Sequence, residues 1–246
     1  MLSLIGLGVS GDLTLRGKEL AKKSDEAYAE VHTGILQEGW QKRMEKTIGK
    51  KITLVEREVL ESDFIVKRAK EKDVALLVAG DPLAATTHYT HLQDARKAGI
   101  EVKVVHNSSI FTAAPGKAGL QHYKFGKTAT LAYWRKNYEP VSALEIAEQN
   151  RKNGLHTLLL LDLDKDMGPM GAKTAFSQIG KMEEKLGRKI ISKLAVLSRV
   201  GWDDEKISYG AVDELKKRNL GKPPFCFIIP GKLHFAEEEN LEAFRR

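Results

Sequence analysis

The sequence predicts an α/β protein with two domains, the first built on a parallel sheet and the second on a mixed sheet. In the first half, short apolar runs alternate with helical patterns of about ten residues, which is typical of βαβ units. The run at residues 74–79 is apolar on both faces, as expected of a strand that helices cover on both sides. In the second half, residues 127–133 alternate between polar and apolar side chains, which indicates a half-exposed sheet.

Five strands are expected in the first half, at residues 2–7, 26–31, 52–55, 74–79 and 101–105. The helices between them are expected at about 14–23, from a Ser62 cap to residue 72, and from a Thr86 or Thr87 cap to a stop at Gly99. Serine and threonine oxygens accept hydrogen bonds from the first free amides of a helix. Glycine readily takes the left-handed conformation that follows a helix end.

The second half is expected to follow a different order. Its strands are placed at residues 127–133, 157–163, 193–198 and 225–229, and its helices at 142–153, 173–186, near 211–218, and from 235 onward. Between the halves, residues 113–126 carry Pro115 and several glycines, which favours a loop. We therefore expect a domain boundary that divides the chain into residues 1–113 and 114–246.

Composition places the chain among globular intracellular proteins. Of its 246 residues, 42% are hydrophobic and 30% charged, and no apolar run approaches the ~20 residues that a membrane span needs. The first residues lack the basic segment of a secretion signal, so a cytoplasmic protein is expected. The net charge is +7, but lysines and arginines alternate with acids, and no basic patch with stacking aromatics indicates direct nucleic-acid binding.

Cysteine and histidine content gives no sign of a metal site. The single cysteine, Cys226, lies in an apolar run and is expected to be a buried, inert thiol. His88 and His91 are spaced to share a helix face, but no third ligand lies nearby. A surface or helix-capping role is the simpler interpretation, and we expect no metal.

A first candidate site is the G-x-G-x-x-G sequence formed by Gly6, Gly8 and Gly11 after the first strand. In dinucleotide-binding folds such glycines let the backbone approach a pyrophosphate, and an acid about 20 residues further on binds the ribose. Glu30 stands at that distance. This pattern favours NAD, but residues 11–14 still have loop character where the motif requires a helix start. A turn that needs glycine only for its backbone is the alternative.

Two further loops follow strands and carry more chemistry. The loop at residues 80–88, Gly-Asp-Pro-Leu-Ala-Ala-Thr-Thr-His, combines a flexible glycine, the acceptor Asp81 and a stiffening proline. The loop at residues 106–110 offers small hydroxyls and backbone amides, although as a bare pattern it is only a helix cap. Since α/β sheets bind ligands at the carboxyl ends of their strands, both loops are candidate binding elements.

The loop at 80–88 resembles the G-D-P-x-x-A-T-T-H motif of the diphthine synthases, methyltransferases of the tetrapyrrole-methylase fold. The resemblance continues along nearly the whole chain, through the segments at residues 5–8, 123–128, 154–159, 223–224 and 230–234. The segment at 162–173 departs from the family pattern, and so does His32, where a tyrosine is usual.

The resemblance implies S-adenosyl-L-methionine as cofactor, held in the cleft between the two domains. The contacts carried over by position are Val9, Asp81, Ala84, Ser109, Ile110, Leu161, Val200 and Phe225. It also implies a homodimer, and a substrate that is elongation factor 2 bearing a 3-amino-3-carboxypropyl group on a histidine, whose amine is methylated. The sequence names no catalytic residue, because water or a carboxylate could take the proton from the amine.

Two alternative functions remain open at this point. The first is methylation of a tetrapyrrole, a corrin or siroheme precursor, by an enzyme of the same fold. The segment at residues 123–128 favours the protein-modifying branch instead. The second is an NAD-binding oxidoreductase, which only the glycine spacing supports.

Overall fold

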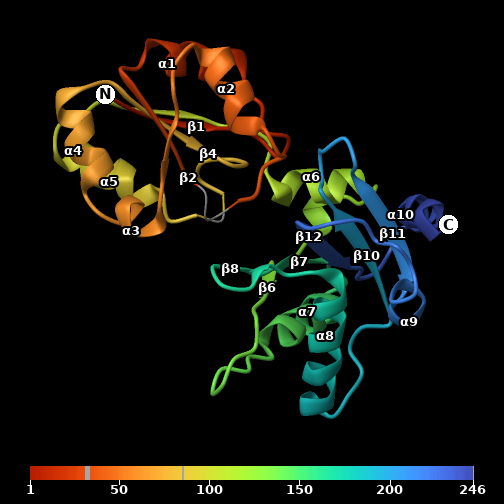
Figure 1. Ribbon diagram of the computed structural model, residues 1–246. Coiled ribbons are helices and arrows are strands. Elements are labelled where there is room, and N and C mark those ends of the chain that lie inside the picture. Colours follow the sequence, from red (N-terminus) through yellow and green to blue (C-terminus); the bar gives the residue numbers. More distant parts are fainter. Residues whose placement is uncertain (31–33, 85, 246) are drawn as a thin grey trace. The chain divides into compact units, whose positions relative to one another are not determined.

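The computed structural model describes residues 1–30, 34–84 and 86–245 (Figure 1). The chain forms two compact units, one of Met1–Ile110 and one that begins at Phe111, and each has its own sheet. The predicted strand end at Val31, the departure at His32, and Ala85 in the loop at 80–88 lie outside the described residues.

The first unit contains a five-stranded parallel sheet, as the sequence predicts, with the strand order β3-β2-β4-β1-β5. Its strands are β1 (Leu2–Gly6), β2 (Glu26–Glu30), β3 (Thr53–Val55), β4 (Val74–Val78) and β5 (Val102–Val105). Its helices are α1 (Leu15–Lys23), α2 (Trp40–Ile48), α3 (Arg57–Leu60), α4 (Phe64–Glu71) and α5 (Tyr89–Lys97). Each strand therefore begins at or near its predicted position.

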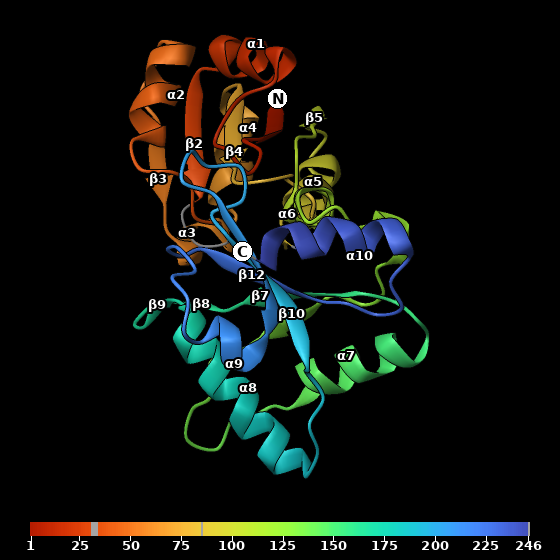
Figure 2. The same ribbon diagram turned by 90° about the vertical axis from the view of Figure 1, so that its right-hand side faces the viewer.

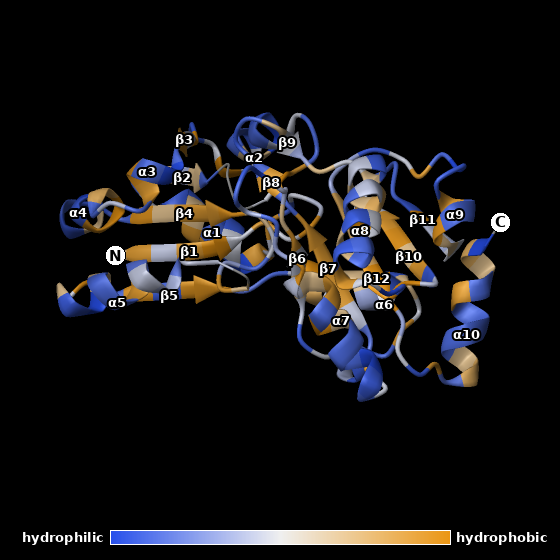
Figure 3. Cartoon of the chain, turned by 90° about the horizontal axis from the view of Figure 1, so that it is seen from below, coloured by the Kyte–Doolittle hydropathy of each residue, from blue (hydrophilic) through white to orange (hydrophobic). Residues whose placement is uncertain are grey.

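Helices cover both faces of this sheet, and the side chains of β4 show why. Ala75 and Leu77 pack in the core beneath α1 and α2. Val74, Leu76 and Val78 pack with α3, α4 and α5 on the opposite face. Both faces of the central strands β1 and β4 are apolar (Figure 3). Burial of each leucine, isoleucine or valine side chain in these two strands stabilises the fold by roughly 1.5–3 kcal/mol.

The helix starts differ from the prediction by a few residues. Thr14 caps α1, its hydroxyl accepting a hydrogen bond from the Gly17 amide at 3.0 Å. α5 begins only at Tyr89, after His88. The sequence analysis missed α2, although Trp40, Met44 and Ile48 recur at the four-residue spacing of a helix face.

The second unit contains a mixed five-stranded sheet of order β11-β10-β12-β7-β6, in which only β6 and β7 pair in parallel. Its strands are β6 (Ala129–Leu131), β7 (Thr157–Leu161), β10 (Lys193–Ser198), β11 (Lys206–Ala211) and β12 (Phe225–Ile229). Its helices are α6 (Ile110–Lys117), α7 (Ser142–Lys152), α8 (Ala172–Leu186), α9 (Val212–Leu215) and α10 (Phe235–Glu242). Figures 1 and 2 show α7 and α8 on one side of the sheet and α10 on the other.

Three segments of the second unit differ from the prediction. Residues 113–117 belong to α6 although Pro115 and the glycines around it predicted a loop. Only half of the helix expected near 211–218 forms, as the short α9, and the strand β11 precedes it. The segment at 162–173 contains a small hairpin of β8 (Leu163–Asp164) and β9 (Gly168–Pro169), held by Asp164, which accepts two backbone hydrogen bonds. No helix within the described residues is long and apolar enough to cross a membrane.

Candidate functional site

Three loops of the first unit meet at the carboxyl end of its sheet, because β1 lies between β4 and β5. Gly8, after β1, and Gly80, after β4, exchange two backbone hydrogen bonds of 3.0 Å. Both glycines have positive φ, 63° and 73°. Few residues other than glycine adopt this conformation readily, so the bridge between the loops depends on these glycines.

Asp81 fastens the loop after β4 to the loop after β5. Its Oδ1 accepts the amide of Leu83 at 3.0 Å, and its Oδ2 accepts the amide of Asn107 at 3.2 Å. The same Oδ2 lies 2.8 Å from Nδ1 of His106. The carboxylate is only 13% exposed, so most of its surface already contacts the protein. Asp81 therefore holds two loops of the site together. From the sequence it was expected only to offer an acceptor to a ligand, and this structural role was not anticipated.

Asn107 connects the loop after β5 to the loop after β1. Its side-chain amide donates to the carbonyls of Gly6 at 3.0 Å and Asp12 at 2.9 Å. Its Oδ1 accepts the amide of Ser108 at 2.8 Å, and the Ser108 hydroxyl accepts the amide of Val9 at 3.1 Å. The amides of Asn107 and Ser108, which the sequence left available to a ligand, are therefore used within the protein. Sequence analysis assigned Asn107 no role beyond a possible helix cap.

The five site residues predicted in the first unit lie on these three loops or, in the case of Ile110, directly after the last of them. Val9 and Ala84 are partly exposed at the turns after β1 and β4, Ser109 is buried, and Ile110 opens α6. Hydrogen bonds between the loops fix the backbone that carries them. The structure thus brings these residues together at one end of the parallel sheet.

The same geometry shows that the dinucleotide interpretation of the glycines is wrong. The amides of Leu7, Gly8 and Val9 donate to Val78, Gly80 and Ser108, so they are not presented to a pyrophosphate. α1 begins at Leu15, beyond the third glycine of the motif. Glu30 is buried and lies against His88, so it is not placed to bind a ribose.

The three site residues predicted in the second unit lie at one end of its mixed sheet. Leu161 ends β7, Phe225 opens β12, and Val200 follows β10. Phe225 pairs with Ser198 in the register of β10, and Cys226 pairs with Leu160. The backbone amide of Arg199 then donates to Pro224 at 2.8 Å. The antiparallel register therefore gathers these three residues as the loops gather the other five.

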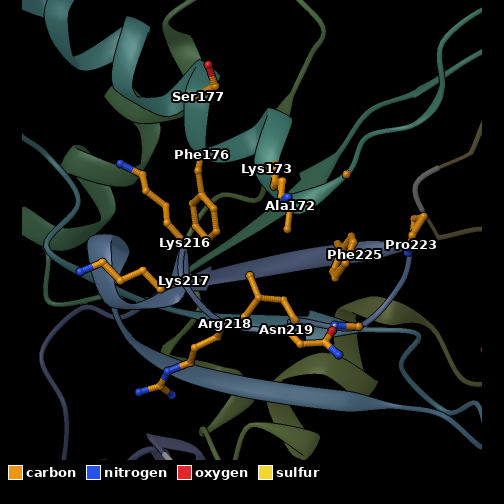
Figure 4. Close-up of a pocket in the computed structure, with 13 residues that line it drawn as sticks. Ala172, Lys173, Phe176, Ser177, Lys216, Lys217, Arg218, Asn219, Pro223 and Phe225 are labelled. Atoms are coloured by element: carbon orange, nitrogen blue, oxygen red, sulfur yellow. The ribbon is translucent and has the colours of Figure 1, made fainter.

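A pocket of about 850 Å³ lies beside Phe225 in this unit (Figure 4). The first turn of α8, residues 216–221, Pro223 and Phe225 form its walls. Phe176 and Phe225 supply aromatic surface, and the charged side chains that line it are all basic: Lys173, Lys216, Lys217 and Arg218. Such a pocket suits a flat apolar group with negative charge nearby.

Comparison with known proteins identifies the family. The model of the tetrapyrrole (corrin/porphyrin) methylases matches residues 1–216. The chain belongs to this family of methyltransferases. It is 40% identical to the diphthine synthase of Methanococcus maripaludis and 38% identical to that of Methanocaldococcus jannaschii, over 98% of each chain. A crystal structure of diphthine synthase superposes with a TM-score of 0.89 at 33% identity and covers 99% of this chain and 95% of its own.

Within the tetrapyrrole methylases the chain is a member of the diphthine synthase group, as its full-length similarity shows. The predicted fold and family are thereby confirmed. These comparisons do not favour the two alternatives, methylation of a tetrapyrrole and NAD-dependent oxidation.

A buried network around Glu237 explains three of the segments on which the family resemblance rests. Its carboxylate pairs with Lys124, lies 3.2 Å from Nε2 of His156, and accepts the backbone amides of Gln121 at 3.0 Å and His234 at 2.9 Å. Nδ1 of His156 accepts the amide of Gly231 at 2.9 Å. Segments distant in sequence are thus joined inside the second unit, and His234 has a structural role, capping α10.

The remaining titratable side chains singled out in the sequence are buried. Cys226 is a buried free thiol, and burial raises its pKa to about 12, so it is inert as expected. His88 and His91 are buried, which corrects the expectation of a polar surface. Among the residues that the structure describes, no three His, Cys, Asp or Glu side chains cluster to hold a metal.

Proposed function

We propose that this protein transfers methyl groups from S-adenosyl-L-methionine to the amine of the 3-amino-3-carboxypropyl-histidine of elongation factor 2. The full-length similarity to diphthine synthases carries the proposal, since it includes every segment on which the resemblance rested. The ordered loops of the first unit support it, because they give the predicted cofactor contacts a fixed backbone.

Within each unit taken by itself, the residues at the predicted positions fit this cofactor. Apart from its chain neighbours, the described residue nearest to the position of a Cβ on Gly80 is Ser108, whose carbonyl oxygen lies 3.9 Å away, so a ligand can approach that backbone closely. Val9, Ala84 and Leu161 are partly exposed and apolar, and Phe225 offers an aromatic wall for an adenine. Bound S-adenosyl-L-methionine supplies an electrophilic methyl group on a sulfonium. The chain itself has to hold the reactants in line and exclude water.

Two measurements test this function. S-adenosylhomocysteine at about 100 times its dissociation constant should stabilise the protein by about 2.7 kcal/mol, whereas NADH should have no effect. Labelled cofactor should then methylate elongation factor 2 only when the factor already carries the aminocarboxypropyl group. Stabilisation by NADH alone, or equal labelling of modified and unmodified factor, would contradict the proposal, and transfer to a tetrapyrrole precursor instead would support the alternative.

Asn107→Ala should weaken binding of S-adenosylhomocysteine by about tenfold. The substitution removes the donors to Gly6 and Asp12, and each lost hydrogen bond costs about 1 kcal/mol, so the loop after β1 is no longer held against the loop after β5. Isothermal titration calorimetry measures the affinity. Asn153→Ala, at an exposed helix end, is the matched control and should bind normally. Equal affinities for the two variants would contradict this role of Asn107.

A homodimer and a cytoplasmic location complete the proposal. Exposed apolar side chains, among them Leu15, Tyr123 and Phe235, provide surface that a second copy could cover. A translation factor as substrate requires a location with the ribosomes. Light scattering of the purified protein tests the dimer, and a monomer at micromolar concentration would contradict it.

A further inference from the structure

A hydroxyl, an imidazole and a carboxylate form a continuous line in the first unit. Nδ1 of His88 contacts Oγ1 of Thr86, and Nε2 of the same ring lies against the carboxylate of Glu30 at the end of β2. The side chains of His88 and Glu30 are 1% and 2% exposed, whereas Thr86 is partly exposed. These contacts therefore lead from the buried Glu30 to the partly exposed Thr86, which lies in the loop that carries Asp81 and Ala84.

The contacts fix the direction in which this line can transfer a proton. Because Nε2 faces a carboxylate, it carries the hydrogen in the neutral ring, and Nδ1 is left to accept from the Thr86 hydroxyl. Glu30 then orients the ring and stabilises it when it gains a proton, as carboxylates do beside catalytic histidines.

The neighbouring charges leave this pairing intact. The ring of His91 lies 6.0 Å from that of His88, and burial, followed by His88, lowers the pKa of His91, so His91 stays neutral near neutral pH. Asp94, on the same helix, acts electrostatically on His91, and Arg57 of α3 acts on Glu30. His106 pairs with Asp81 and does not contact the line.

The proposed reaction needs a group that removes protons. An aliphatic amine has a pKa well above 7 and is mostly protonated near neutral pH, so it has no free electron pair with which to attack. Each methyl transfer also leaves a positive charge on nitrogen, which must lose a proton before the next transfer. One proton therefore has to leave the acceptor in every round.

We propose that Thr86 takes this proton from the acceptor amine and passes its own hydroxyl proton to His88, with Glu30 as the positioning residue behind the ring. This inference rests on the proposed function. The ammonium N–H bond breaks and a new O–H bond forms on Thr86, while the former hydroxyl proton moves to Nδ1. Thr86 remains neutral, the imidazolium is paired with Glu30, and the freed amine pair forms the bond to the methyl group. After product release the proton returns to water by the same route.

Thr86→Val tests this proton relay, the transfer from the acceptor amine through Thr86 to His88. Valine keeps the shape of threonine and removes only the hydroxyl. We expect kcat near neutral pH to fall on the order of 100-fold, the range of general-base effects, while affinity for S-adenosylhomocysteine stays unchanged. The rate of the variant should rise about tenfold per pH unit above neutrality, because the acceptor then loses its proton to water. Thr86→Ser should restore most of the rate.

Thr87→Val is the matched control, because Thr87 is exposed and, among the described residues, its hydroxyl makes no hydrogen bond to the His88 ring, unlike that of Thr86. It should retain the rate and the pH profile of the unaltered protein. Glu30→Gln should lower kcat as well, and should shift the proton NMR resonance of the His88 Nε2–H, which Thr86→Val leaves in place. If Glu30→Gln unfolds the protein, the partly exposed Thr86 variants still decide the matter.

The outcomes separate the relay from the function on which it rests. An active unaltered protein with an equally active Thr86→Val variant would overturn the relay alone. Absence of methyl transfer by the unaltered protein, with elongation factor 2 in its modified form, would overturn the proposed function and the relay together. A loss of rate with Thr86→Val that is accompanied by weaker binding of S-adenosylhomocysteine would overturn the relay, since it would show a structural role.

Discussion

Glu237→Leu should lower the free energy of unfolding of the second unit by about 3–5 kcal/mol, the cost of breaking a buried ion pair. Glu237 is 1% exposed and holds Lys124, His156 and two backbone amides. Leucine fills a similar volume but leaves these donors without an acceptor. Urea unfolding followed by circular dichroism measures the change.

Glu239→Leu is the matched control, because Glu239 lies on the same helix and is exposed. Exposed substitutions change stability by only about 0.5 kcal/mol. Equal unfolding midpoints for the two variants would show that the network around Glu237 contributes little.

The same network should make the protein sensitive to acid. Burial alone raises the pKa of Glu237, but hydrogen bonds from the His234 amide, Lys124 and the Gln121 amide outweigh it and hold the pKa at about 2, against 4.5 for an unperturbed group. The folded state thus binds this proton less readily than the unfolded state. The stabilisation, on the order of 3 kcal/mol, is complete above pH 4.5 and is lost as the pH falls toward 2. Unfolding midpoints of the unaltered protein and Glu237→Leu should therefore converge in acid.

The fold could be predicted wherever periodicity and burial agree. β4 is apolar on both faces because helices cover both, and the sequence shows this directly. β11 and α6 were missed for opposite reasons. β11 is followed immediately by a helix and contains Gly210, which weakens the strand pattern. In α6, Pro115 and the adjacent glycine have low helix propensity, so the sequence predicted a loop there.

The site could be predicted as a set of positions but not as a set of contacts. Loops after strands 1, 4 and 5 were expected to bind a ligand, and the structure brings them together. That Asp81 accepts from Asn107 follows from the strand order, in which β1 separates β4 from β5, and no local pattern encodes that order. The contact between Glu30 and His88 likewise depends on β2 lying beside β4.

Gly8→Ala should weaken binding of S-adenosylhomocysteine by about 30- to 100-fold, equivalent to about 2–3 kcal/mol. A Cβ at this position would lie 2.8 Å from the Ser108 hydroxyl and 2.9 Å from Oδ1 of Asn107, closer than real contacts allow. Those two side chains hold the loop after β1, so displacing them moves Val9 and breaks the bridge to Gly80.

Gly11→Ala separates this collision from backbone strain. Gly11 also has positive φ, 76° against 63° for Gly8, so alanine costs about 1–2 kcal/mol of strain at either position. The nearest atom to a Cβ on Gly11 is Cβ of Trp40 at 3.5 Å, an ordinary contact. Both variants should therefore lose stability in thermal unfolding, Gly8→Ala more than Gly11→Ala because its collision adds to the strain, but only Gly8→Ala should lose affinity in calorimetric titration. Equal affinities would show that the loop after β1 does not position the cofactor, and that the close approach of Gly8 to Asn107 and Ser108 serves folding alone.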